Sequence, residues 1–249
     1  MVVWRLIELE GHDAYFNMAA DEAIGKEILE RRARPTIRFY TWKPCAVSIG
    51  HFQSMRDEID VEKCKELGID YIRRKTGGGA VYHDEKGELT YSVIAPQELF
   101  PKGILESYKA ICGWVVDALR ALGMDANFAP INDIVVEGKK ISGNAQSRSG
   151  GILLQHGTIL YDLNLEKMFS VLKISKEKIA DKMIKDARMR VTCVREHAAI
   201  DRGALYRALL DGFTNGKECE AGALSVGELR IIEELERTEY KTDSWNFMR

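Results

Sequence analysis

The sequence has few cysteines, and none of them are paired. Five cysteines occur in 249 residues, and no two form a C-x-x-C motif. This spacing argues against a zinc cluster or a disulfide framework, and it is typical of a protein in a reducing compartment. We therefore expect a cytoplasmic protein. The cysteines are Cys45, Cys64, Cys112, Cys193 and Cys219.

Long apolar runs and an excess of one charge are also missing. No apolar run approaches the roughly 18 residues of a membrane span, and the first eight residues already contain an arginine and a glutamate. We predict neither a membrane segment nor a secretory signal. The 36 cations and 38 anions leave a net charge of −2, which argues against a general nucleic-acid binder. The length suits one large domain or two small ones, and the 45% hydrophobic content is enough for a sizeable core. No obvious linker divides the chain, and we expect a single domain over residues 1–249.

Two common nucleotide-binding motifs are absent, namely G-x-x-x-x-G-K-[ST] and a helix-opening G-x-G-x-x-G. The chain instead has three cations, Arg73 to Lys75, then Thr76 and three glycines, Gly77 to Gly79. Bare N–H groups in a glycine turn can bind an anion, and neighbouring cations add a favourable field. Composition alone leaves two interpretations: a pocket for a phosphate-like group, or a solvated surface turn.

Hydrophobic periodicity predicts an α+β domain, with a mixed, largely antiparallel sheet and flanking helices. We expect 46–50 to lie beside 36–40, strands 80–83 and 89–95 to form a hairpin, and the strands after 132 to form a meander. Residues 174–193 are charge-rich and suggest a mobile loop or a weak helix. The predicted strands are 2–8, 36–40, 46–50, 69–73, 80–83, 89–95, 132–136, 140–148 and 152–161, and the predicted helices are 13–32, 60–68, 105–122, 201–214 and 225–237.

Polar residues gather in four segments next to these predicted strands, where a sheet could bring them together. On the first helix, by contrast, we expect Asn17, Asp21 and Glu22 to form a solvated face. The four segments are 73–83, 132–133, 139–146 and 155–157.

These segments resemble the lipoate–protein ligase A family (catalytic large domain) of the biotin/lipoate protein ligase superfamily. The resemblance runs in order over roughly residues 4–197, with a weaker match at Tyr240 and Trp245-Asn246. Four ordered motifs are far more specific than one glycine turn, so the resemblance favours the pocket. The matching stretches are Asn17–Glu22, Val47–Gly50, Arg73–Asp84, Asn132–Ile134, Lys140–Gln146, His156–Leu160 and Arg190–Thr192.

The resemblance implies the superfamily's catalytic-domain fold and an AMP-forming ligase. Lipoate would react with ATP and Mg²⁺ to give lipoyl-adenylate. The lipoyl group would then pass to a lysine of a lipoyl domain, in a 2-oxoacid dehydrogenase E2 subunit or the glycine cleavage H protein. Lipoate and octanoate are not distinguished as substrates.

The resemblance also assigns roles to residues. Lys140 is the catalytic cation between the carboxylate and the α-phosphate, Asp133 is a possible Mg²⁺ ligand, and Asn132 could instead only hold a turn. His83 is equally well a pocket wall or a buried, satisfied histidine. Lys178, Lys182 and Lys185 could reach phosphate from a covering loop. The implied nucleotide-side residues are Arg74, Gly79, Ala80, Val81, Tyr82, Asn132, Asp133 and Lys140, and the implied lipoate-side residues are Gly77, Gly78, His83, Lys140, Gly143, His156 and Gly157.

Three alternatives remain. An octanoyl/lipoyl transferase has the same fold but carries the acyl group on a cysteine thiolate, and neither 172–176 nor 129–133, where the family places it, contains a cysteine. Cys193 is the residual candidate. A biotin ligase would show a Gly-Arg-Gly-Arg run, which is missing. A non-catalytic lipoate- or nucleotide-binding subunit would lack Lys140 or Arg74. Full-length ligases often carry a small C-terminal accessory domain, which we expect a separate subunit to supply.

Overall fold

The computed structural model describes residues 2–173 and 180–249, without side chains for 180–184. The strands are β1 (Val3–His12), β2 (Thr36–Trp42), β3 (Ala46–Ile49), β4 (Asp70–Arg73), β5 (Val81–His83), β6 (Glu88–Pro96), β7 (Ala126–Ala129), β8 (Asp133–Val136), β9 (Lys139–Ser149), β10 (Ile152–Leu160) and β11 (Glu218–Ala221). The helices are α1 (Ala14–Leu29), α2 (Met55–Glu58), α3 (Val61–Glu66), η1 (Gln97–Leu99), α4 (Ile104–Ala121), α5 (Leu165–Val171), α6 (Ala180–Arg190), α7 (Val194–His197), α8 (Arg202–Thr214), α9 (Val226–Leu235), η2 (Glu236–Tyr240) and α10 (Asp243–Asn246).

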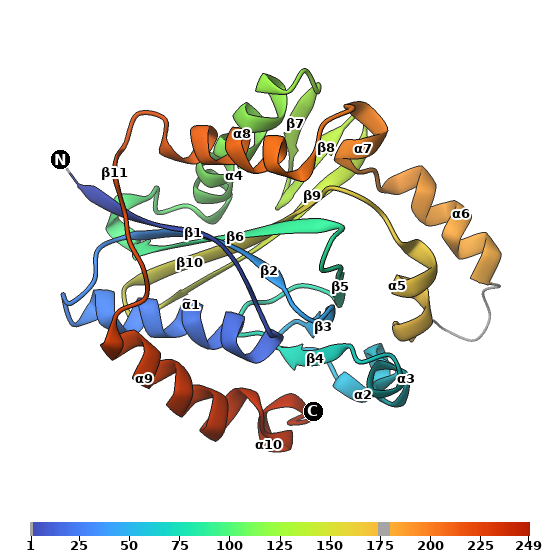
Figure 1. Ribbon diagram of the computed structural model, residues 1–249, viewed down its shortest axis with the longest axis horizontal. Coiled ribbons are helices and arrows are strands. Elements are labelled where there is room, and N and C mark those ends of the chain that lie inside the picture. The colour runs from blue at the N-terminus through green and yellow to red at the C-terminus, as the bar shows by residue number, and fades with distance from the viewer. Residues whose placement is uncertain (1, 174–179) are drawn as a thin grey trace.

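Two sheets form the centre of the fold (Figure 1). The large sheet has the strand order β11-β1-β2-β6-β10-β9-β8-β7, and the small one has the order β4-β3-β5. In the large sheet β1 runs parallel to β11 and β2, while the pairs from β2 to β7 are antiparallel. The predicted α+β class with a mixed, largely antiparallel sheet is confirmed, as is the meander of β8, β9 and β10.

Two strand pairings predicted from the sequence are wrong. Strand β3 pairs with β4 and β5 in the small sheet and does not lie beside β2. Strands β5 and β6 are no hairpin, because β5 pairs with β3 while β6 lies between β2 and β10. Local patterns identify strands well, but partners depend on contacts between distant segments. The chain therefore passes from one sheet to the other at residues 84–87.

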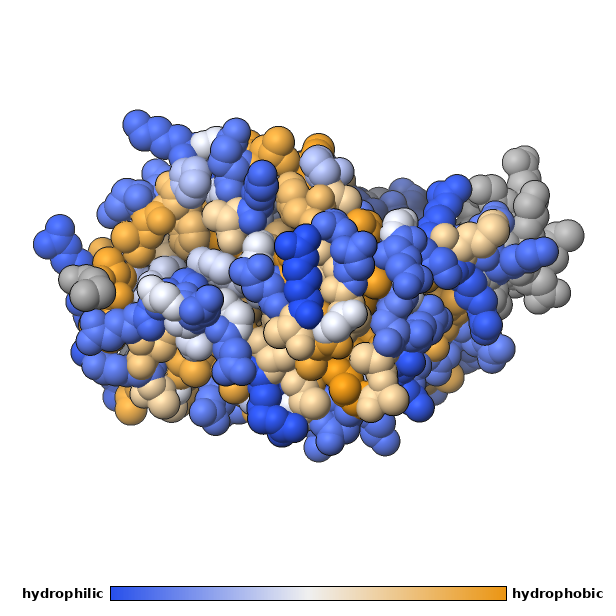
Figure 2. Space-filling view, turned by 90° about the horizontal axis from the view of Figure 1, so that it is seen from above, coloured by the Kyte–Doolittle hydropathy of each residue, from blue (hydrophilic) through white to orange (hydrophobic). Residues whose placement is uncertain are grey.

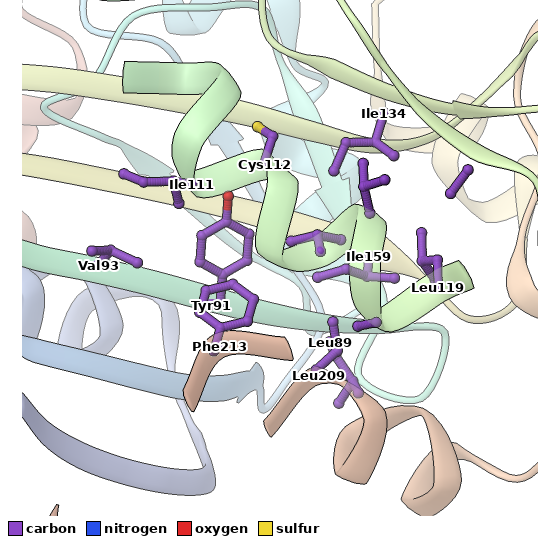
Figure 3. Close-up of a cluster of buried hydrophobic side chains, with 14 of the residues drawn as sticks. Leu89, Tyr91, Val93, Ile111, Cys112, Leu119, Ile134, Ile159, Leu209 and Phe213 are labelled. Carbon is purple, nitrogen blue, oxygen red and sulfur yellow. The ribbon is translucent and has the colours of Figure 1, made fainter. Parts of the chain in front are cut away.

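Helices cover both faces of the large sheet (Figure 1). On one face α4 and α8 pack on each other, and on the other α1 packs on α9. Apolar residues of α4 occur every three or four positions and lie buried against β6 and β10, with α8 completing the cluster (Figure 3). Burial of this stripe, rather than intrinsic propensity, stabilises such a helix. The labelled members of the cluster are Leu89, Tyr91, Val93, Ile111, Cys112, Leu119, Ile134, Ile159, Leu209 and Phe213.

Asn17 and Asp21 of α1 are buried, which overturns the expectation of a solvated face for these two residues, whereas Glu22 is partly exposed and paired with Lys26 and Lys75. Asn17 is 0% and Asp21 2% exposed. Both receive hydrogen bonds from the guanidinium of Arg38 on β2, and Arg38 Nη1 lies 3.0 Å from Asp21 Oδ1. Ser92 Oγ donates to the same oxygen at 2.8 Å. A buried charge is tolerated only when it is paired and hydrogen-bonded, so this network holds α1 on the sheet.

The C-terminal residues are packed against the small sheet. Asn246 Oδ1 accepts a hydrogen bond from the Arg73 N–H at 2.9 Å, and Trp245 Nε1 donates to the Arg73 carbonyl at 2.8 Å. The buried Arg73 guanidinium in turn donates to the carbonyls of Trp245, His51 and Asn246. The outer edge of β4 is therefore capped by α10 instead of being left open.

Three further features differ from the expectations or extend them. Strands β7 and β11 were not predicted; both are only four residues long. Within 174–193, residues 180–190 form helix α6, while 174–179 lie outside the described residues.

Seen from above, hydrophilic residues are spread over the surface with apolar residues between them (Figure 2). Among the described helices, none is long and apolar enough to cross a bilayer.

Candidate active site

A cavity of about 330 Å³ lies where the two sheets meet. Its wall comes from β2, β3, β5 and β6, from the glycine turn after β4, and from β9, β10 and the segment before α5. The topology thus brings together the four polar segments of the sequence. The predicted site residues on the wall are Arg74, Gly78, Gly79, Ala80, Val81, Tyr82, His83, Asn132, Lys140, Gly143, His156 and Gly157.

Lys140 lies at the start of β9 and belongs to the cavity wall. Its Nζ is 2.7 Å from Asp133 Oδ1, and the two side chains are 41% and 35% exposed. The pairing of β8 with β9 is irregular here, since Val135 lies opposite Lys140 and Ile134 opposite Ser142, so Ile141 is an extra residue. Such bulges redirect neighbouring side chains and are common at active sites. The ammonium is thus half-exposed and available to an anion.

Gly143 leaves room for the Lys140 side chain. A Cβ at residue 143 would lie 2.8 Å from Lys140 Cε and 2.9 Å from its Nζ. Any larger residue at this position would therefore push the ammonium aside. Gly143 and Lys140, both among the implied lipoate-side residues, therefore lie side by side.

Asn132 makes the contacts of a residue that holds a turn. Its Nδ2 donates to the Asn144 carbonyl, and its own carbonyl accepts from the Asn144 backbone N–H at 3.0 Å and from Asn144 Nδ2 at 2.9 Å. These reciprocal bonds fix the start of β8 against β9, next to Lys140 and Asp133. Asp133 itself is not part of the cavity wall, but its carboxylate contacts Lys140 and its backbone pairs with Gly143, and both of these residues are on the wall.

Arg74 organises the glycine turn from inside. The side chain is 5% exposed, and Nη2 donates to the carbonyls of Gly77 and Gly79, each at 2.8 Å. Nη1 donates to Ser48, to the carbonyl at 3.2 Å and to Oγ at 3.1 Å. Burial lowers the pKa of Arg74 to about 10, so the guanidinium stays charged at neutral pH. In this state the proposed phosphate-side cation has its terminal nitrogens engaged by the turn.

Of the two cations beside Arg74, Arg73 is buried, in contrast to the solvated turn considered from the sequence, whereas Lys75 is exposed but paired with two carboxylates. Arg73 is 0% exposed, with its guanidinium among backbone carbonyls. Lys75 Nζ lies 2.9 Å from Glu22 Oε2 and 2.8 Å from Glu239 Oε1. Burial alone would lower the pKa of Lys75, but the two carboxylates outweigh it and raise the pKa. The three consecutive cations thus fix the turn to three different neighbours.

His156 joins the glycine turn to α1. Its Nε2 lies 2.7 Å from Thr76 Oγ1, and its Nδ1 lies 3.5 Å from Asp21 Oδ2. Burial lowers the pKa of His156, although Asp21 acts in the opposite direction. The neutral imidazole therefore predominates at pH 7. A lining or structural role for this predicted lipoate-side residue fits the geometry better than the role of a base.

Gly157, the neighbour of His156, has no space for a side chain. A Cβ there would lie 1.9 Å from Asn144 Oδ1 and 2.7 Å from Tyr91 Cε1. Tyr91 and Asn144 are themselves hydrogen-bonded at 2.7 Å. A larger residue at position 157 would therefore displace this hydrogen-bonded pair.

His83 is both a wall residue and a satisfied buried histidine, so its two predicted alternatives coexist. Nε2 lies 2.8 Å from Ser48 Oγ, and Nδ1 lies 2.7 Å from Glu88 Oε1. The ring is stacked on Trp42, with centroids 3.9 Å apart and planes at 16°. Ser48, His83 and Glu88, which we name the Ser48–His83–Glu88 row, all belong to the cavity wall. No role was predicted for Ser48 or Glu88; Glu88 carries no local sequence signal.

The five cysteines all lie in the described part of the chain, and none belongs to the cavity wall. Burial raises the pKa of Cys64 and of Cys112 to about 12 and also raises that of Cys193, the residual candidate for a transferase nucleophile. The thiol, not the nucleophilic thiolate, therefore predominates at neutral pH in these three residues. Among the described residues, no three His, Cys, Asp or Glu side chains are grouped to hold a metal ion.

Comparisons with known proteins agree with this site. Residues 13–214 match the model of the lipoyl protein ligase A/B catalytic domain. An octanoyltransferase LipM of Brevibacillus brevis is 36% identical, with all of both chains covered. A bi-partite lipoate protein ligase of Thermoplasma acidophilum, solved in a study with its E2 lipoyl domain, is 31% identical with a TM-score of 0.88, covering 99% of this chain and 96% of that one. A lipoate–protein ligase A bound with ATP is 29% identical with a TM-score of 0.85, covering 99% of each chain.

The fold and the site define an enzyme of the class that attaches lipoyl or octanoyl groups to proteins. The chain belongs to the lipoyl protein ligase A/B catalytic domain family, over residues 13–214. The resemblance drawn from the motifs is confirmed.

Proposed function

We propose that this enzyme is a lipoate–protein ligase that activates lipoate with ATP. One observation carries the proposal. The cavity wall offers the Lys140 ammonium but no cysteine, so it suits activation by a nucleotide better than transfer through a thioester. The similarity to a ligase crystallised with ATP supports the same choice.

The geometry accounts for the first half-reaction. A lipoate oxygen attacks the α-phosphorus of ATP, and pyrophosphate leaves. Both reactants are anionic, and the Lys140 ammonium, a compact point charge, would lie between them. Since Lys140 is paired with Asp133 here, its ammonium has to turn from Asp133 toward the substrates. Asp133 would then be free to bind Mg²⁺ that arrives with ATP, because Mg²⁺ typically takes one or two carboxylates together with substrate phosphates.

In the second half-reaction a lysine amine of a lipoyl domain attacks the activated carbonyl, and AMP leaves. The adenylate must be shielded from water until that lysine arrives. Helix α6 lies next to the site, since Val191 at its end pairs with Lys140 and belongs to the cavity wall. Lys185 on this helix is exposed, whereas Lys178 lies outside the described residues and the side chain of Lys182 is not described. We propose α6 as the cover of the adenylate.

Octanoyl transfer is the second candidate function. It is favoured by the names of the curated relatives, which are octanoyltransferases aligned with this chain over nearly all of its length. An octanoyl carrier thioester would then replace ATP as the source of activation. The two functions differ in a simple requirement: transfer by a thiolate needs one of the five cysteines.

Replacing all five cysteines with serine or alanine is expected to leave ATP-dependent activation of lipoate within about threefold of the unmodified enzyme, because no thiol lines the cavity. The measurement is pyrophosphate release, together with octanoyl transfer from a carrier thioester without ATP. Circular dichroism shows whether the variant is folded. Loss of turnover in a folded variant, with ATP-independent transfer by the unmodified enzyme, would assign the chain as a cysteine-dependent transferase.

We further propose that a separate small subunit supplies the accessory domain of full-length ligases. The chain covers 96% of one chain of a ligase described as bi-partite, which supports this division. The purified chain alone is then expected to bind lipoate and ATP but to transfer the lipoyl group to a lipoyl domain slowly or not at all. Gel-shift or mass measurement of the lipoyl domain tests this. Full turnover without any added protein would contradict it.

A further inference from the structure

The Ser48–His83–Glu88 row has the hydrogen-bond order of a catalytic triad. Ser48 lies on β3 and His83 on the antiparallel neighbour β5. His83 is paired with Ala46, and Ser48 lies two residues after Ala46 on the same strand. The side chains of Ser48 and His83 therefore lie on one face of the small sheet. Oγ to Nε2 measures 2.8 Å, and Nδ1 to Oε1 of Glu88 measures 2.7 Å. Both distances lie within the range expected for a nucleophile with its base and for a base with its orienting group.

The neighbours of the row determine where its protons lie. Arginine can only donate, so Ser48 Oγ accepts from Arg74 Nη1 at 3.1 Å. The carboxylate of Glu88 can only accept, which places a proton on Nδ1 of His83. In the neutral imidazole Nε2 is then the acceptor, and the Ser48 hydroxyl donates to it. This is the arrangement in which histidine can remove the hydroxyl proton.

The row is also held in place from outside. Trp42 is stacked on the imidazole and donates through Nε1 to Thr90 Oγ1 at 2.9 Å. Thr90 Oγ1 donates in turn to Glu88 Oε1 at 3.0 Å. Ser48, His83 and Glu88 are 1%, 4% and 1% exposed. A buried base of fixed orientation beside a hydroxyl on the wall of an acyl-binding cavity has the features of a covalent acyl-transfer site.

We propose that Ser48 is a nucleophile that accepts an acyl group from an acyl thioester, with His83 as the base and Glu88 as its orienting group. This serine-dependent acyl transfer is a further activity beside the proposed ATP-dependent reaction. It rests on the proposed function only because it assumes that the cavity holds the acyl chain. It also offers a route to acyl transfer for a chain with no thiol at the cavity wall, although its relatives are named octanoyltransferases.

The reaction balances without a cofactor. His83 Nε2 takes the hydroxyl proton as Ser48 Oγ bonds to the thioester carbon; the carbon–sulfur bond breaks, and the thiolate leaves with that proton. The Arg74 guanidinium, already in contact with Ser48 Oγ, stabilises the negative charge that develops on Oγ as its proton leaves. An acceptor amine then attacks the serine ester through the same base. The carbon–oxygen bond breaks, an amide forms, and the hydroxyl is restored.

The test uses the variant without cysteines, so that no thiol can take the acyl group, and octanoyl-N-acetylcysteamine as the thioester probe. After quenching, intact mass and peptide mapping are expected to show one octanoyl ester on Ser48. His83→Gln is expected to slow its formation by about 10²–10⁴-fold, the usual contribution of a general base. Ser107→Ala, which removes a buried hydroxyl of α4 away from the cavity wall, is expected to change nothing.

Two further variants keep the proposal open to contradiction. Ser48→Ala is expected to give no adduct, while Ser48→Cys is expected to form a thioester at the same position. Absence of label at residue 48 in both the cysteine-free protein and its folded Ser48→Cys variant would overturn the proposal. Pyrophosphate release from lipoate and ATP, measured on the same samples, reports separately on the ATP-dependent function. Failure of the serine acyl transfer and failure of the proposed ligase function can therefore be distinguished.

Discussion

Lys140→Ala is expected to lower the rate of lipoyl-adenylate formation by about 10²–10³-fold, the usual loss when a charge-stabilising group is removed from an active site. Lys140 belongs to the cavity wall, and Gly143, another wall residue, leaves space for its ammonium beside Asp133. Its loss would leave the lipoate carboxylate and the triphosphate to meet without a cation between them. The charge acts most strongly in the transition state, so kcat should fall more than the affinity for either substrate.

Lys139→Ala is the matched control, because Lys139 is the adjacent lysine on β9 and does not belong to the cavity wall. Pyrophosphate release under single-turnover conditions, with lipoate and ATP in excess, measures the step directly. The control is expected to stay within about twofold of the unmodified enzyme, as surface substitutions usually have small effects. Near-normal activity of both variants would contradict the proposed role of Lys140, and equal losses in both would point to damage of β9.

Gly50→Ala is expected to displace the glycine turn and to lower kcat/KM for lipoate by about 10²-fold, which is the cost of misplacing a site by roughly 1 Å. A Cβ at residue 50 would lie 2.1 Å from the carbonyl oxygen of Gly78 and 3.1 Å from the carbonyl carbon of Gly77. These are backbone atoms, so rotation of a side chain cannot relieve the contact. The turn carries Gly78 and Gly79 of the cavity wall, which would have to move.

Gly113→Ala provides the control for a glycine replaced without a clash. Gly113 lies within α4, and a Cβ there would meet no atom within 4 Å. This variant is expected to gain about 0.5–1 kcal/mol in the free energy of unfolding, because alanine is the better helix former. Urea denaturation and lipoate kinetics of both variants measure the two effects. Full activity of Gly50→Ala would show that the turn adjusts without consequence.

The elements that were predicted well carry strong local signals. Helix α4 shows a regular apolar stripe and the meander of β8 to β10 has glycine turns, so both appear within a few residues of the expected bounds. The partners of β3 and β5 depend on segments distant in the sequence, which no local pattern reveals. Asn17 and Asp21 resemble solvated residues on a helix, and only the position of Arg38 on β2 explains their burial.

Contacts between distant segments also limit how much of the site can be predicted from the sequence. The motifs locate the cavity, since most of the residues expected to bind substrate belong to its wall. They do not reveal that Arg74 binds the carbonyls of its own turn, because that contact exists only once the chain reverses at Gly78, whose φ is 102°. Glu88 was missed because a single glutamate at the start of an apolar strand looks like a solvated strand end. Its proximity to His83 arises where the chain passes from one sheet to the other.

The docking of α10 on β4 has a practical consequence for anyone handling the protein. Trp245 and Asn246 bind the backbone of Arg73, which immediately precedes Arg74 and the glycine turn. An affinity tag or fluorescent fusion attached after Arg249 would therefore lie close to these contacts and could disturb them. Trimming the tail for crystallisation at residue 239 would remove carbonyl acceptors from a buried guanidinium. The start of β1, which Figure 1 shows well away from α10, is the safer place for a label.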